Sequence, residues 1–355
     1  MKIGAIPETP LEWLALKLGL APEPLADTHG AMLLARTVMA GAELGVFDAL
    51  AAKPLTRDET AAACGTAAGP TELLLDALLA CGYLRAEGGR FGLTARSRKW
   101  LLSDAPASVR DKLLLQTIEW RWLGELEAFV RSGRPLEFHD AISPAELDLY
   151  HRGMRALAQV AGGEVARRTP LRSGATLMLD IGGSHGHYAA EICRRHPGLS
   201  AEVMDLPEAV EAAAPILARE GLGQRVVHRD GDATSADLGT ERYDLVLMSN
   251  LAHHLDAGQN LDLARRVARA LKPGGAFVIQ EPARAEAPGR AGQVPALLGL
   301  YFAMQSRPDV RTWTVREMAG WQAAAGLRPR RAAALRTAPG WVQQAAIRRP
   351  GETAS

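Results

Sequence analysis

The sequence predicts a two-domain protein of the α/β class, with a mainly helical front half and a mostly parallel sheet behind it. Its 355 residues suffice for about two domains. Helical periodicity dominates before Gly174, and short apolar strands alternate with helical stretches after it. Such interleaving is typical of a parallel sheet covered on both faces. We therefore expect one domain over 1–172 and a second over 173–348, with strands in TLMLDIG, AEVMDLP, RVVHRDG, YDLVLMS and AFVIQEP.

The composition excludes several classes of protein. With 41 basic and 40 acidic residues the net charge is +1, so overall charge attracts neither nucleic acid nor an anionic membrane. The most apolar early stretch, 31–50, contains Arg36, Glu43 and Asp48, which argues against a membrane span. The N-terminus lacks the pattern of a signal peptide, and the three cysteines are scattered. We expect a cytoplasmic protein without a membrane partner.

Residues 55–100 predict a winged helix, that is, two helices followed by a hairpin. Thr56 and Glu59 form a capping box for the first helix, and Gly82 ends the second. Six basic and five acidic residues nearly balance in this segment, and the second helix, PTELLLDALLACG, has no basic or amide side chain. Reading DNA bases requires such side chains. We therefore expect this winged helix to contact protein and not nucleic acid.

A glycine-rich turn follows the first predicted strand in LDIGGSHG, residues 179–186. Such a strand-to-helix turn is where α/β sheets bind nucleotides, although its spacing matches neither dinucleotide binders nor P-loops. Three acidic residues, Asp180, Asp205 and Asp232, come at the ends of successive strands. Without a phosphate-binding cation, they favour a sulfonium-bearing nucleoside over NAD or ATP. The alternative is that all three are helix caps or turn residues.

These segments, followed by NLAHHLD and LKPGGAFVIQEP, resemble class I S-adenosylmethionine-dependent methyltransferases. With the winged helix, nearly the whole chain is similar to small-molecule O-methyltransferases of the plant caffeic-acid and bacterial polyketide-tailoring types. The resemblance implies a Rossmann-like domain with a mostly parallel seven-stranded sheet, S-adenosylmethionine as cofactor, and a winged-helix dimerisation domain that forms an intertwined homodimer. The cofactor-binding residues that it implies are Asp180, Gly182, Gly183, Gly186, Asp205, Leu206, Asp232, Ala233 and Ser249.

The resemblance also implies a catalytic pair. Family enzymes have a general-base His at the end of the fourth strand and an orienting carboxylate 28 residues later, which here are His253 and Glu281. Imidazole has a pKa near 6.5 and can accept a phenolic proton at neutral pH. The alternative is that His253 only caps a helix over 253–270 and that Glu281 pairs with an arginine.

The chain departs from the family pattern near this site. Ser184 stands where the family usually has a third glycine, and His185 where it has a threonine. The usual His-Asp-Trp is His253-His254-Leu255, and a Lys of the plant enzymes is Ser249. A second carboxylate expected at 310–314 is absent, although Asp309 precedes that segment. The cofactor site tolerates these changes, whereas the assignment of the base rests on fewer matches.

The resemblance places the acceptor pocket between the domains. Candidate acceptor-binding residues are Trp120, Met154 (in YHRGM), His254, Phe302 and Met304. Any one of them can equally be a core residue, but together they indicate a flat, apolar acceptor. His254 is also a candidate second base or metal ligand. The spacing of His185, His187 and His228 matches no known metal set, so we expect no metal.

These observations favour methyl transfer from S-adenosylmethionine to a hydroxyl of a small aromatic or polyketide-like acceptor from secondary metabolism. Two alternatives keep the cofactor: methylation of carbon or nitrogen, and a non-methylating cyclase or decarboxylase. A DNA-binding regulator is disfavoured by the charge balance of the winged helix.

Overall fold

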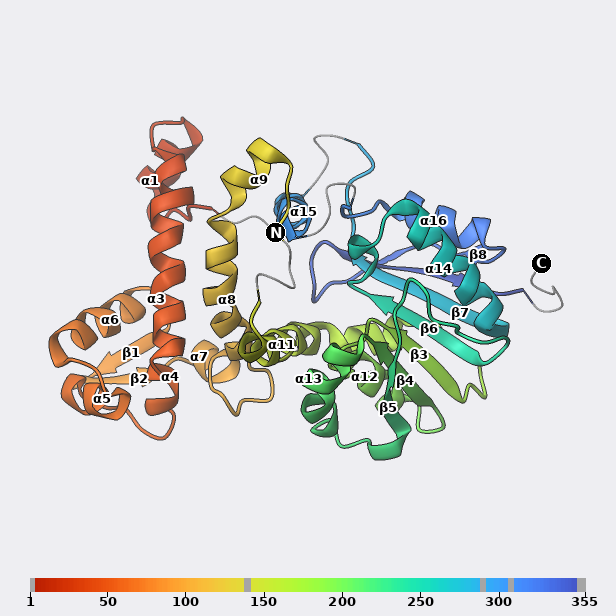
Figure 1. Ribbon diagram of the computed structural model, residues 1–355. Coiled ribbons are helices and arrows are strands. Elements are labelled where there is room, and N and C mark those ends of the chain that lie inside the picture. The colour runs from red at the N-terminus through yellow and green to blue at the C-terminus, as the bar shows by residue number, and fades with distance from the viewer. Residues whose placement is uncertain (1–3, 137–141, 288–291, 306–309, 350–355) are drawn as a thin grey trace. The chain divides into compact units, whose positions relative to one another are not determined.

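The computed structural model describes residues 4–136, 142–287, 292–305 and 310–349. It divides into two compact units, Lys2–Trp120 and Arg121–Ser355, which are described separately (Figure 1). The boundary expected at 172 comes after the helix α11 (Pro144–Arg168), which packs against α12 (His187–Arg195) and α13 (Pro207–Ala218) of the second unit. None of the described helices is long and apolar enough to cross a membrane.

The first unit is helical and contains the predicted winged helix. Thr56 and Glu59 form the expected capping box of α5, and Leu84 pairs with Leu93 in the antiparallel hairpin. Two basic side chains of the winged helix form ion pairs, Arg57 with Glu72 at 2.7 Å and Arg90 with Glu59. The elements of this unit are α1 (Pro10–Lys17), α2 (Glu23–Leu25), η1 (Ala26–Gly30), α3 (Ala31–Glu43), α4 (Val46–Ala49), α5 (Arg57–Cys64), α6 (Ala68–Ala80), β1 (Leu84–Glu87), β2 (Arg90–Leu93), α7 (Ala95–Trp100) and most of α8 (Arg110–Leu123).

The second unit contains the mostly parallel sheet, in the order β5-β4-β3-β6-β7-β10-β8. Its strands are β3 (Leu177–Ile181), β4 (Ser200–Asp205), β5 (Val226–Asp230), β6 (Tyr243–Ser249), β7 (Leu271–Pro282), β8 (Arg328–Pro329), β9 (Ala333–Ala334) and β10 (Trp341–Ile347). Strands β3 to β7 pair in parallel, and β10 pairs antiparallel to β7. Among the described residues the sheet has eight strands and not the expected seven, because two short strands, β8 and β9, both pair with β10.

Helices cover both faces of this sheet, and the two-residue period of the strands assigns side chains to each face (Figure 1). In β3, Leu179 and Ile181 belong to the core cluster that includes side chains of α14 (Ala257–Ala270) and α16 (Val315–Ala324). Met178 belongs to the opposite cluster, with residues of α11, α12 and α13. The remaining elements are α9 (Leu126–Ser132), η2 (Gly223–Arg225), η3 (Ala252–His254) and α15 (Gln293–Gln305).

Asp244, in β6, stabilises the start of β3 through side-chain hydrogen bonds. Its fully buried carboxylate accepts hydrogen bonds from the backbone N–H of Thr176 at 2.9 Å and of Leu177 at 3.2 Å. It also pairs with the Lys272 ammonium at 2.8 Å and with the Arg172 guanidinium. Burial opposes the charge, but these partners outweigh burial and hold the pKa of Asp244 well below its usual range.

We predict that Asp244→Ala lowers the free energy of unfolding by roughly 3 kcal/mol in urea titrations at pH 7. A depressed folded-state pKa means that this contribution is complete above the unfolded pKa of about 3.9 and is lost as the pH falls below it. The control is Asp262→Ala, whose carboxylate forms a surface pair with Arg266 and should change stability by less than about 0.5 kcal/mol. Equal losses for the two variants would contradict this account.

Candidate active site

The turn between β3 and α12 is closely packed by its neighbours. Gly182 has a φ of 66° and donates its N–H to the carbonyl of Met204 at 2.8 Å. A Cβ on Gly183 would lie 2.7 Å from Cγ of Asp180, and a Cβ on Gly186 would lie 2.5 Å from Leu217. These contacts explain why glycines are needed here: the backbone approaches its neighbours too closely for a side chain.

The carboxyl ends of β3, β4 and β5 meet at one edge of the sheet, as predicted. Asp205 accepts hydrogen bonds from the N–H groups of Ser184 at 2.8 Å and Leu206 at 2.9 Å, and its carbonyl accepts from Gly231 N–H at 2.9 Å. Asp232 follows Gly231. Both oxygens of Asp232 accept hydrogen bonds from Thr234, at 2.7 and 2.8 Å, an arrangement that agrees with the turn role kept as the alternative and leaves further lone pairs on each oxygen.

Asp180 is a buried carboxyl group with one unpaired oxygen among the described residues. Its side chain is 1% exposed, and its Oδ1 has no hydrogen-bond partner among the described residues. Burial and the nearby charge of Asp205 raise the pKa of Asp180 to about 8, and burial raises the pKa of Asp205 as well. A positively charged ligand would stabilise the ionised form of both Asp180 and Asp205, and S-adenosylmethionine carries a sulfonium and an ammonium group. The unpartnered Asp180 oxygen and the glycine-rich turn therefore fit this cofactor.

The predicted catalytic pair is formed. His253 is 2% exposed, and its Nδ1 lies 2.7 Å from Oε2 of Glu281 near the end of β7. The other oxygen, Oε1, accepts a hydrogen bond from the backbone N–H of Ala252 at 2.7 Å. The Glu281 carboxylate therefore binds both the His253 ring and the backbone of the preceding residue. His253 does not cap the following helix, because that helix begins later, with Asp256 as its N-cap.

Two side chains that the sequence analysis did not select hold the backbone before His253. The carbonyl of Ala252 accepts the indole N–H of Trp313 at 2.7 Å and the amide of Asn260 at 3.0 Å. Trp313 lies in the segment 310–314 where a second carboxylate was expected, and Asp309 lies outside the described residues. In the sequence, the only signal for Trp313 is its place in the segment 310–314, where the family pattern has a functional residue.

The loop of His253 is also tied to the glycine turn. A Cβ on Gly182 would lie 3.0 Å from a methyl of Leu251, so the two segments are in close contact. Ser249, at the end of β6, accepts a hydrogen bond from the Gln280 amide at 3.0 Å. The candidate cofactor residues and the candidate base therefore lie next to each other at one edge of the sheet.

Of the candidate acceptor-binding residues, Phe302 and His254 are next to His253. The Phe302 ring stacks on the His253 ring, with centroids 4.1 Å apart and an interplanar angle of 21°, and the His254 ring centroid lies 4.3 Å away. Met154, on α11, is half-buried. Trp120 belongs to the first unit, where the Arg36 guanidinium lies over its ring.

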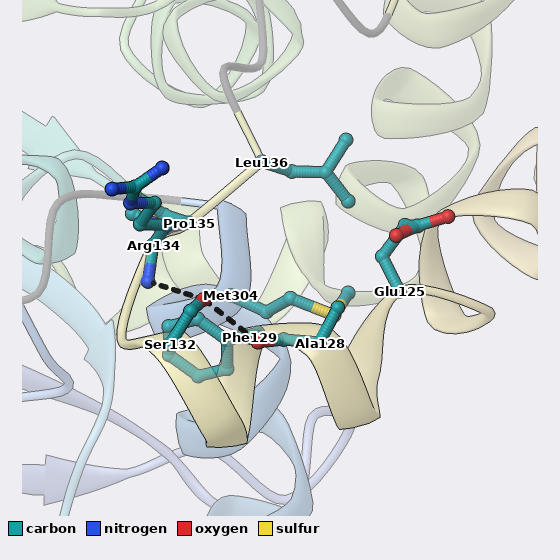
Figure 2. A pocket seen from close by; sticks show the side chains of 8 residues that line it. All are labelled: Glu125, Ala128, Phe129, Ser132, Arg134, Pro135, Leu136 and Met304. Carbon is teal, nitrogen blue, oxygen red and sulfur yellow. Dashed lines mark hydrogen bonds between the residues drawn. The ribbon is translucent and has the colours of Figure 1, made fainter.

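Met304 points elsewhere. Residues two apart on a helix point in nearly opposite directions, so the face of α15 that carries Phe302 is not the one that carries Met304. Met304 lines a separate pocket of about 180 Å³ with Phe129 of α9, shown in Figure 2. The backbone N–H of Leu136 closes this region by donating to the Met304 carbonyl at 2.7 Å.

In the described part of the chain, no group of three or more His, Cys, Asp or Glu side chains is arranged to hold a metal ion. Three of the histidines considered as ligands have other contacts. His187 pairs with Glu220 at 2.9 Å, the N–H of His187 bonds to the ring of His185, and His228 bonds to the carbonyl of Ser184.

A glycine-rich turn beside buried carboxylates, with a buried His–Glu pair next to it, is the arrangement that the resemblance to S-adenosylmethionine-dependent methyltransferases implies. The family comparison agrees. Residues 127–327 match the O-methyltransferase domain family, and residues 27–103 match the O-methyltransferase dimerisation domain. The chain therefore belongs to the O-methyltransferase family, and S-adenosylmethionine is the methyl donor of that family.

Individual relatives are named as O-methyltransferases. Acetylserotonin O-methyltransferase of Rattus norvegicus is 32% identical over 285 residues, which cover 76% of this chain and 64% of the rat enzyme. The 3-hydroxy-5-methyl-1-naphthoate 3-O-methyltransferase of Streptomyces sahachiroi is 29% identical over 73% of this chain and 77% of its own length. The solved structure of human N-acetylserotonin methyltransferase in complex with SAM has a TM-score of 0.81 at 25% identity, covering 97% of this chain and 99% of that chain.

We predict that Gly183→Ala weakens the binding of S-adenosylhomocysteine roughly tenfold or more in calorimetry, because its Cβ would collide with Asp180 and Val203. Gly198→Ala is the matched control, since a Cβ there meets no described atom within 4 Å. Undiminished binding by the Gly183 variant would show that the turn does not form the cofactor site.

Proposed function

We propose that this chain transfers the methyl group of S-adenosylmethionine to a hydroxyl of a small aromatic acceptor, with His253 as the general base. The observation that carries the proposal is the buried 2.7 Å contact between His253 Nδ1 and Glu281, beside the glycine turn. The residues proposed to bind the cofactor are Asp180, Gly182, Gly183, Gly186, Asp205, Leu206, Asp232, Ala233 and Ser249.

The pair has the geometry that a base requires. With its Nδ1–H donated to the Glu281 carboxylate, the neutral ring carries its lone pair on Nε2, and the carboxylate stabilises the imidazolium that forms. The cofactor, when bound, supplies an electrophilic methyl group. As the acceptor oxygen bonds to that methyl, the carbon–sulfur bond breaks, S-adenosylhomocysteine leaves, and Nε2 of His253 takes the hydroxyl proton. Positioning of the two reactants provides the rest of the rate enhancement.

An aromatic acceptor is supported by the surroundings of the base and by the relatives. Phe302 and His254 present flat rings beside His253, and such surfaces favour a planar, apolar molecule. The names of the rat and Streptomyces relatives specify acetylserotonin and a hydroxynaphthoate, both of which are aromatic. Trp120, Met154, His254, Phe302 and Met304 remain the proposed acceptor-binding residues, with Phe302 and His254 the best supported by contact to His253.

We predict that His253→Ala lowers kcat for a hydroxylated acceptor by about 10²- to 10⁴-fold, while the Kd of S-adenosylhomocysteine stays within about twofold. The assay follows S-adenosylhomocysteine formation with N-acetylserotonin and hydroxynaphthoates, and mass spectrometry with NMR identifies the methylated atom.

His196→Ala is the control for loss of a half-buried histidine away from the pair. Unchanged turnover in the His253 variant would overturn the base assignment. A product methylated on carbon or nitrogen, or one without a new methyl group, would replace hydroxyl methylation with one of the alternatives.

We further propose that the chain is a cytoplasmic homodimer. A dimerisation domain is matched, and α1 has no buried residue in the described structure although its sequence, PLEWLALK, is largely apolar. Leu11 is 76% exposed, and Trp13, Leu18 and Leu20 are also exposed. Exposed apolar patches of this kind mark contact surfaces. Cys64, Cys81 and Cys193 are free thiols, which suits a reducing compartment.

We predict that the wild-type chain sediments as a dimer and that Leu11→Glu combined with Leu18→Glu shifts it to monomer, because burying two charges against a partner is unfavourable. Analytical ultracentrifugation measures the mass, with Glu8→Gln as a control in the same segment. A monomeric wild type, or a double variant that stays dimeric, would remove α1 from the interface.

A further inference from the structure

The glycine turn is held by a histidine from α11 that the cofactor site described so far does not use. Nδ1 of His151 lies 2.5 Å from the hydroxyl oxygen of Ser184, across 33 positions of sequence. The His151 side chain is only 3% exposed, and its Nε2 is buried without a hydrogen-bond partner among the described residues.

Ser184 is an unusual residue for its position. Its φ of 41° lies in the left-handed region, which disfavours residues other than glycine. Three groups hold it there: the His151 ring on its side chain, the Asp205 carboxylate on its N–H at 2.8 Å, and the His228 ring on its carbonyl at 2.8 Å. His151 therefore stands at the same turn as Asp205.

A buried imidazole nitrogen without a partner is unfavourable, and such nitrogens in native proteins are almost always satisfied. Burial lowers the pKa of His151 to about 4, so the ring is neutral at pH 7 and its Nε2 is either a single donor or a single acceptor. The contact of Nδ1 with Ser184 places the His151 ring against the glycine turn. S-adenosylmethionine carries ribose hydroxyls and a carboxylate, which can hydrogen-bond to this nitrogen.

We propose that His151 is a cofactor-binding residue whose Nε2 hydrogen-bonds to an oxygen of S-adenosylmethionine, while its Nδ1 fixes Ser184 in the turn. This inference rests on the cofactor site and is independent of the role proposed for His253.

The test separates the two nitrogens of His151. His151→Asn places an amide near the position of Nδ1 but removes Nε2, so it should weaken S-adenosylhomocysteine binding about 10- to 100-fold in calorimetry with an unchanged Tm. His151→Gln, whose longer amide reaches the position of Nε2, should recover most of the affinity. His196→Asn is the matched control.

Ser184→Gly distinguishes contact from positioning, because glycine adopts a φ of 41° without the hydroxyl. It should change the Kd less than threefold, and His151→Asn should still weaken binding in that background. If the effect of His151→Asn vanishes there, His151 acts only through Ser184 and direct contact is overturned. Wild-type affinity in the single Asn variant would overturn it as well.

Comparison of two ligands identifies the oxygen. Methylthioadenosine has the ribose but no carboxylate, so a penalty that persists with it assigns the contact to the ribose, and one that disappears assigns it to the carboxylate. Binding of S-adenosylhomocysteine by the wild type is the reference. If the wild type fails to bind, the cofactor site itself is wrong, whereas normal wild-type binding with an unaffected His151→Asn variant refutes only the present proposal.

Discussion

The close approach of the turn 182–186 to its neighbours is the constraint on which the rest of the site depends. Added Cβ atoms at Gly182, Gly183 and Gly186 would come within 3.0 Å of side chains from four segments. The turn is therefore fixed from several sides before any ligand arrives. A preformed site of this kind loses little conformational entropy when the ligand binds.

The alternation of side chains along each strand then assigns the side chains of the site to the two faces of the sheet. Along β7, Phe277 and Ile279 belong to the cluster on the face covered by α14 and α16, and Glu281 lies on the same face because side chains alternate along a strand. Gln280 therefore lies on the other face, which α11, α12 and α13 cover. Asp180 shares the first face with Met178. Carboxyls with raised pKa and the His–Glu pair thus come from opposite faces of one sheet and meet at its carboxyl edge. The buried carboxyls and the His253–Glu281 pair thus have separate surroundings within one site.

The fold and the core of the site could be predicted because their signals are local. Short, nearly continuous apolar segments between helical stretches identify β3 to β7, and the LDIGGSHG turn with Asp205 indicates the candidate cofactor edge. The pair of His253 and Glu281 came from its spacing in the family pattern. Strand β10 is not among the five strands that the sequence predicted, and the short strands β8 and β9 were missed as well, since Arg328–Pro329 and Ala333–Ala334 show no strand periodicity. Their pairing depends on β10 and not on their own sequence.

What sequence could not provide are contacts between distant segments and the rotation of helices. Trp313 reaches the Ala252 carbonyl across 61 positions, and neither residue has a pattern that indicates it. Phe302 and Met304 are both apolar, and only the rotation of α15 places one of them on His253 and the other in a separate pocket.

The pairing of Ser184 with His151 shows how a departure from a family pattern can be stabilised. A serine in the left-handed region is strained by about 1 kcal/mol or more relative to glycine. The three hydrogen bonds of Ser184 offset that strain, and one of them buries an imidazole whose second nitrogen has no described partner. If residue 151 served only to pack against the turn, a polar ring would not be required at that position. An apolar side chain on α11 would fill the same space without leaving a buried nitrogen unpaired. The cost of that nitrogen is understandable if a bound molecule completes its hydrogen bonding.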